Sequence, residues 1–127
     1  MNWTAAGAAA MALAVMLGAF GAHGLQGRLD ACSMGVYEKA VFYHFVHALG
    51  MLIVSGLRAA GALTRSSAQW TCVLLAAGIL IFSGSLYALA VTGNRMLGAI
   101  TPIGGVSFIA AWVVLAVSAS RSRPPAS

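Results

Sequence analysis

Residues 71–92 read TCVLLAAGILIFSGSLYALAVT, and this stretch decides the class of fold. It contains no charged side chain over a length that, as an α-helix, crosses the roughly 30 Å hydrocarbon core of a bilayer. Within lipid, the backbone amides of one segment find hydrogen-bond partners only in a helix or a closed barrel. The stretch therefore predicts a transmembrane helix.

The rest of the chain repeats this pattern. Three further runs also lack Asp, Glu, Lys and Arg over a comparable length, at residues 5–22, 40–57 and 96–117. The links between the runs are too short for a separate soluble domain, so residues 1–127 are expected to form a single integral membrane domain. Short links also place neighbouring helices antiparallel. The sequence thus predicts an all-α fold, a four-helix transmembrane bundle made of two antiparallel hairpins.

Composition supports the same class. Hydrophobic residues make up 61% of the chain and charged residues only 7%, which leaves too little polar surface for a soluble globular protein. The net charge of +5 comes from basic residues that stand singly between apolar runs rather than on one face. Such spacing argues against nucleic acid as a partner and indicates the lipid bilayer instead.

The basic residues also bear on orientation. The side of the membrane that holds the N-terminus has Arg58, Arg65, Arg121 and Arg123, whereas the other side has Arg28, Lys39 and Arg95. Because basic loops favour the cytoplasm, this distribution favours cytoplasmic termini. The first run has an alternative interpretation as a secretory signal that is cleaved after small residues near Gly21. Against it, no basic side chain precedes the run, and Trp3 suits an interfacial anchor.

Polar side chains gather toward one end of the predicted helices. At about 100° per residue, Tyr37, His44 and His47 share one face of the second helix, while Ser83 and Tyr87 share a face of the third. Ionisable groups in a bilayer usually turn inward to partners, so we expect a buried polar layer in one leaflet. Its candidate members are His23, Tyr37, Tyr43, His44, His47, Ser83, Ser85, Tyr87 and Thr101.

Small residues predict where helices approach closely and where they end. They recur at four-residue steps at Ala10, Ala14, Gly18 and Ala22, and again at Gly84 and Ala88. Such steps allow backbones to touch in lipid, so we expect close packing at Gly84. Gly93 is predicted to cap the third helix, and Thr101 to cap a fourth helix with Pro102 at its first position. Residues 96–100 would then form a separate lead-in. The alternative is one continuous helix that is kinked at Pro102.

Four strings carry a family resemblance. They are GAFGAHGL (18–25), YHFVHAL (43–49), FSGSLYAL (82–89) and TPIGGVSF (101–108), in this order. Together they resemble the YgdD-like family of small bacterial inner-membrane proteins, which is related to a small eukaryotic mitochondrial membrane protein. The resemblance spans nearly the whole chain and implies a multi-pass protein of the inner (plasma) membrane with no characterised activity. The recurrent polar positions of the family correspond to His23, Tyr43 or His44, His47, Ser83, Ser85, Tyr87, Thr101 and Pro102.

The leading functional interpretation is a structural or accessory subunit. Its polar layer would hold the two hairpins in register, and its outer faces would contact a second copy of the chain or a larger membrane complex. An enzyme is not expected, because the sequence lacks paired carboxylates, a nucleophile with its base, and a cofactor motif. No cofactor is expected either. Cys32 and Cys72 should lie on opposite sides of the membrane, which excludes a disulfide between them.

Two alternatives remain open. His23, His44 and His47, with Met51 one turn further along, could bind copper or zinc, although neither HExxH nor CxxC occurs in the sequence. Intramembrane histidine and tyrosine could instead serve a small transporter, a proton-conducting element or a lipid-binding module. Each alternative depends on which side chains the fold brings together.

Overall fold

The computed structural model of the chain describes residues 1–122. In chain order its elements are α1 (Trp3–Phe20), η1 (Gly21–Leu25), α2 (Ala31–Ala59), α3 (Arg65–Gly78), η2 (Ile79–Ser83), α4 (Gly84–Thr92), η3 (Arg95–Ala99) and α5 (Thr101–Arg121). The elements η1 and η2 are π-helical turns that continue their neighbours, and η3 is a 3-10 turn. Arg123, which entered the orientation count, lies outside the described residues.

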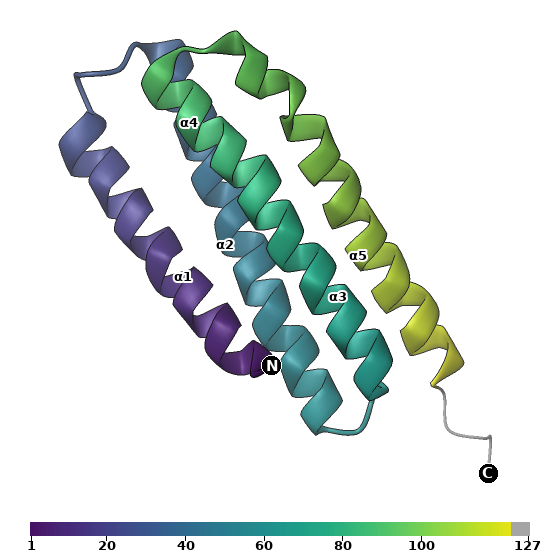
Figure 1. The fold of residues 1–127 in the computed structure, drawn as a ribbon. Helices are drawn as coiled ribbons and strands as arrows, with labels where there is room; N and C mark the ends of the chain where they lie inside the picture. Colours follow the sequence, from purple (N-terminus) through teal and green to yellow (C-terminus); the bar gives the residue numbers. More distant parts are fainter. Residues whose placement is uncertain (123–127) are drawn as a thin grey trace.

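Four of the resulting helical segments are long and apolar enough to cross a membrane within the described range: Trp3–Leu25, Ala31–Ala59, Arg65–Thr92 and Arg95–Arg121. α1 packs on α2, and α5 packs on α3 and η2. α2 also packs against α3 and α4, so these helices form the middle of the bundle, with α1 and α5 on its two flanks (Figure 1). The predicted bundle of two antiparallel hairpins is confirmed.

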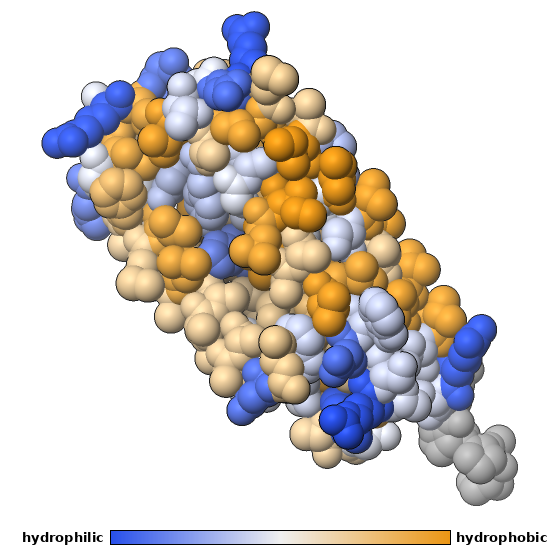
Figure 2. Space-filling model, viewed as in Figure 1, coloured by the Kyte–Doolittle hydropathy of each residue, from blue (hydrophilic) through white to orange (hydrophobic). Residues whose placement is uncertain are grey.

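The two ends of the bundle differ in what they carry. We call the end that holds η1 and Gly93 the hairpin end (Figure 1). The opposite end holds the start of α1, the link between α2 and α3, and the end of α5, and we call it the terminal end. Figure 2 shows hydrophobic side chains along the middle of the bundle and hydrophilic ones toward both ends. Large apolar side chains such as Leu80 and Val106 are mostly exposed there, as expected of a surface that lipid covers.

The helices are longer than the apolar runs that predicted them. α2 begins at Ala31, well before residue 40, because the side chain of Asp30 accepts a hydrogen bond from the backbone N–H of Ser33 at 2.7 Å. That bond holds the pKa of the exposed Asp30 carboxyl below its usual value. The first turns of α2 carry Glu38 and Lys39, so hydropathy alone does not detect them.

The link between the last two long segments follows the prediction closely. Gly93 has a φ of 72° and its backbone N–H bonds the carbonyl of Leu89, which ends α4. The turn η3 then forms a separate lead-in, and α5 begins at Thr101 with Pro102 in its first turn. The capping position itself is Ile100 and not Thr101, because the helical backbone starts one residue earlier than expected.

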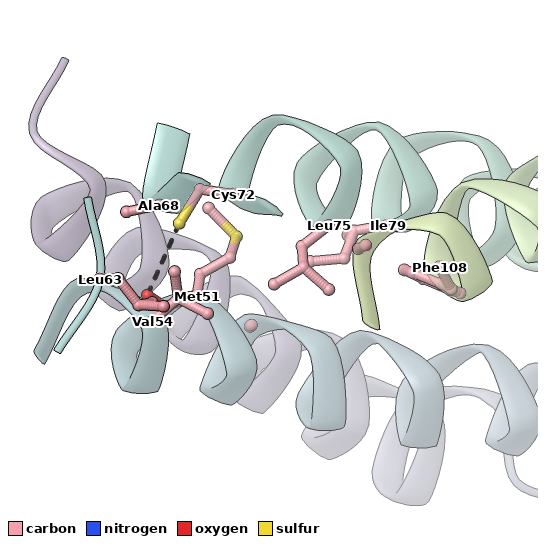
Figure 3. Close-up of a cluster of buried hydrophobic side chains, with 10 residues drawn as sticks. Met51, Val54, Leu63, Ala68, Cys72, Leu75, Ile79 and Phe108 are labelled. Atoms are coloured by element: carbon pink, nitrogen blue, oxygen red, sulfur yellow. Dashed lines mark hydrogen bonds between the residues drawn. The ribbon is translucent and has the colours of Figure 1, made fainter. Parts of the chain in front are cut away.

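Apolar packing fills the bundle nearer the terminal end. Figure 3 shows Met51 and Val54 of α2 facing Cys72 and Leu75 of α3, all of them almost fully buried. The Cys72 thiol points to the carbonyl oxygen of Met51 at 3.9 Å. Cys32 is exposed at the start of α2, and both cysteines are free, as predicted.

Close backbone packing occurs at other glycines than expected. A Cβ on Gly104 of α5 would overlap the backbone of Phe82 in η2, and one on Gly78 would overlap the ring of Phe108. By contrast, nothing lies within 4 Å of a Cβ placed on Gly84, so the prediction of close packing there is wrong. The π-helical turn η2 adds a residue to the helix and so shifts its phase before Gly84.

Candidate functional site

The polar layer begins with His44 in the middle of α2. This side chain is only 2% exposed, and its Nδ1 lies 2.9 Å from the hydroxyl of Tyr87 in α4. The ring of Tyr87 packs beside that of Tyr37, with 5.2 Å between ring centroids. Tyr37 in turn donates its hydroxyl proton to the carbonyl of Leu17 in α1 at 2.6 Å. These contacts join α1, α2 and α4.

His47, one turn further along α2, points to α5 instead. Its Nε2 lies 3.1 Å from the indole Nε1 of Trp112, and its Nδ1 lies 2.7 Å from the carbonyl of Tyr43. An indole N–H can only donate, so Nε2 of His47 is the acceptor. The imidazole proton therefore sits on Nδ1 and is donated to the backbone carbonyl of Tyr43. The imidazole ring also stacks on the ring of Phe108, with 3.5 Å between the ring centroids. Both nitrogens of a neutral His47 are therefore satisfied.

Hydroxyl groups supply the remaining contacts between helices. Ser83 in η2 donates to the carbonyl of Ala40 in α2 at 2.9 Å, and both residues are fully buried. The hydroxyls of Ser85 and Thr101 lie 2.6 Å apart and join α4 to α5. The resemblance strings that contain these two residues thus pack directly against each other, since Phe82 also meets Gly104.

The structure separates the predicted residues into groups. Tyr37, His44, Ser83 and Tyr87 connect α1, α2, η2 and α4, while Tyr43 and His47 extend the layer to α5. Ser85 and Thr101 form a pair of their own, and His23 is exposed in η1 at the hairpin end. Hydrogen bonding in this arrangement locks helices together and leaves few free polar groups for chemistry.

The three histidines do not converge on one point. Among residues 1–122, no group of three His, Cys, Asp or Glu side chains is placed to hold a metal ion. Met51 lies in the apolar cluster beside Cys72. A site built from His23, His44 and His47 together is therefore not supported by the fold.

Three interhelical hydrogen bonds involve side chains that the sequence analysis did not select. They are the Trp112 bond to His47, the bond from the Ser107 hydroxyl to the carbonyl of Leu74 in α3 at 2.7 Å, and the bond between the hydroxyls of Thr4 in α1 and Ser55 in α2. The helical spacing could have indicated Trp112 as a contact residue. It follows Phe108 by four residues and Gly104 by eight, which places all three on one side of α5. Ser107 had no such signal.

Comparisons with known proteins indicate the same broad class, a membrane protein. Residues 17–105 match the family model DUF423, described as a protein of unknown function. A UPF0382 membrane protein of Staphylococcus haemolyticus is 48% identical over 112 residues, which cover 88% of this chain and 89% of that protein. One from Staphylococcus epidermidis is 49% identical over 106 residues, 84% of each chain. The UPF0382 membrane protein YwdK of Bacillus subtilis is 48% identical over 111 residues, 86% of this chain and 88% of YwdK. No solved structure matches the chain.

Proposed function

The chain belongs to the DUF423 (UPF0382) family of membrane proteins, and from this premise we propose that it is a structural or accessory subunit of a membrane assembly without enzymatic activity. The observation that carries the proposal is the internal pairing of the polar layer. His47 is hydrogen-bonded to the backbone carbonyl of Tyr43 and to the indole of Trp112. The Ser83 hydroxyl is hydrogen-bonded to the backbone carbonyl of Ala40. Polar groups that are already paired within the bundle serve to fix helix positions rather than to meet a substrate.

The partner of such a subunit is a second copy of the chain or a larger membrane complex. One side of α5 supports this view, since it carries a row of exposed branched side chains at three- and four-residue steps: Ile103, Val106, Ile109, Val113 and Val117. A regular ridge of this kind packs well into the groove of another helix. Lipid chains cover the same surface when no partner is bound.

We place the protein in the bacterial inner (plasma) membrane with both termini in the cytoplasm. The support is the count made from the sequence, which assigns four basic residues, Arg123 included, to the side that holds the N-terminus and three to the other side. We also group the chain with the YgdD-like proteins and their eukaryotic mitochondrial relative, on the four strings quoted above.

The accessory function is tested by purification in a mild detergent, followed by native mass measurement and identification of every protein that copurifies. We expect a defined oligomer or a stoichiometric membrane partner, and Val106→Trp should abolish it by disturbing the α5 ridge. Val15→Trp, at a similarly exposed position on α1, is the matched control and should leave the assembly intact. A monomer with no copurifying protein contradicts the proposal.

A further inference from the structure

Two buried side-chain nitrogen atoms have no hydrogen-bond partner within residues 1–122, Trp3 Nε1 and His44 Nε2. Both residues line the same groove, which has a volume of about 320 Å³. Its walls come from α1 on one side and from α3 and η2 on the other, with α2 between them (Figure 1). The remaining lining is apolar: Met1, Ala6, Ala10, Leu13, Met51, Ala76, Ile79 and Leu80.

The length of this groove matches one leaflet of a bilayer. Along α1 it runs from Trp3 to Leu13, which is about 15 Å at the rise of an α-helix. Half of the hydrocarbon core is also about 15 Å thick. At its deep end lies His44, whose Nε2 has no hydrogen-bond partner among the described residues. The groove therefore has the dimensions of a slot for an acyl chain that enters from the terminal end.

A second cavity continues the groove at that end and has a different character. It has a volume of about 530 Å³, shares Met1 and Trp3 with the groove, and is lined by polar residues that include Arg58, Arg65 and Gln69. The chain has only two acids, Asp30 and Glu38. Both lie toward the hairpin end, and Glu38 is about 30 Å from Arg58 along α2. No Asp or Glu side chain can therefore neutralise the two guanidinium groups.

We propose that the groove and this basic mouth together bind one anionic phospholipid from the leaflet at the terminal end. The phosphate lies between Arg58 and Arg65, because guanidinium groups bind phosphate oxygens strongly and anionic lipids concentrate near basic residues at a membrane surface. An ester carbonyl at the glycerol accepts the unpaired N–H of Trp3. One acyl chain fills the apolar slot between α1 and α3, against Ala10 and Ala76.

The proposal is tested by native mass spectrometry of the full chain in detergent, with phosphatidylglycerol, phosphatidylethanolamine and phosphatidylcholine of equal chain length added in turn. We expect one phosphatidylglycerol to be retained, bound about tenfold more tightly than the other two, because the lining of the mouth includes two arginines and no Asp or Glu. Equal retention of the three lipids overturns the proposal.

Variants locate the binding site. Arg58→Gln and Arg65→Gln should each weaken phosphatidylglycerol binding about tenfold through loss of a charged hydrogen bond. Arg121→Gln makes the same charge change at the same end but outside the groove and mouth, so it should have no effect. If Arg121→Gln weakens phosphatidylglycerol binding equally, the effect comes from the general surface charge. That outcome overturns the proposed binding site.

Two further variants keep the test independent of the arginines. Trp3→Phe removes only the indole N–H and should weaken binding a few-fold, and Ala10→Leu should block the slot, whereas the exposed Ala9→Leu should not. Unchanged binding in both Trp3→Phe and Ala10→Leu overturns the proposal. Glycerol 3-phosphate at millimolar concentration should fail to displace the lipid. Full displacement would assign the mouth to a free phosphate compound instead and overturn the lipid assignment.

Discussion

The half of the bundle nearer the hairpin end is joined mainly by directional hydrogen bonds, whereas the half nearer the terminal end is joined mainly by apolar contacts. In the first, His44 meets Tyr87 and Ser83 meets Ala40 across helix boundaries. In the second, Val54 and Leu75 pack in an aliphatic cluster, with the hydroxyl pair of Thr4 and Ser55 near its edge. Helix association in lipid lacks a hydrophobic driving force, so packing and hydrogen bonds must determine which helices meet and at what height.

This difference explains why the groove occurs where it does. In the hairpin half, Tyr37 reaches from α2 to the Leu17 carbonyl and its ring packs against Gly21, so α1 is held tightly there. Toward the terminal end, small residues of α1 such as Ala6 and Ala10 leave space beside α3. The hydrogen bonds near the hairpin end thus keep α1 in register with α2. The groove near the terminal end can therefore stay open to lipid.

The largest expected effect is the contrast in thiol labelling between the two ends. In intact cells, an impermeant maleimide should label Cys32, which is exposed at the hairpin end, and should leave the buried Cys72 unmodified. In a Cys32→Ser background, a cysteine introduced as Ser66→Cys at the terminal end should be labelled only after the membrane is permeabilised. Labelling of Ser66→Cys in intact cells, together with failure of Cys32 to react in intact cells that carry the unmodified protein, would reverse the proposed orientation.

The second expected effect concerns the closest backbone contact. Gly104→Ala should destabilise the protein by about 3 kcal/mol or more, because the new methyl group overlaps the backbone of Phe82, which cannot rotate away. Gly84→Ala, where open space surrounds the added Cβ, should be neutral or stabilise by up to about 1 kcal/mol. Thermal unfolding in detergent, followed by circular dichroism, measures both. Equal tolerance of the two changes would contradict the packing at Gly104.

A smaller effect is expected in the polar layer. His47→Leu should cost about 1–3 kcal/mol, since it leaves the Trp112 N–H without an acceptor. Loss of the His47 ring also removes its stacking on Phe108. His47→Gln keeps a hydrogen-bonding side chain and should cost less. In a double-mutant cycle, Trp112→Phe should remove most of the difference between the two His47 variants. If the effects of His47→Leu and Trp112→Phe on stability are additive, the hydrogen bond between His47 and Trp112 contributes nothing to stability.

Several features of the candidate site were predictable because they depend on local periodicity. The buried face of α2 follows from the spacing of Tyr37, His44 and His47, and the structure buries all three. Tyr87 was expected in the same buried polar layer as the imidazoles, and its hydroxyl does bond His44. His47, however, bonds Trp112, which lies 65 residues further along the chain. Its partner depends on the rotation of α5, which no local pattern specifies.

The amino-acid sequence by itself determined that the chain forms long apolar helices, in which order they pair, and where Gly93 ends one of them. These properties follow from hydropathy, from link length and from the positive φ that glycine accepts. Only the tertiary structure decided that Gly104 and not Gly84 meets a neighbouring backbone, and that a groove lies beside Trp3. The physical reason is phase: the extra residue of the π-helical turn η2 and the packing of α5 rotate side chains relative to one another, and contacts between distant segments depend on that rotation.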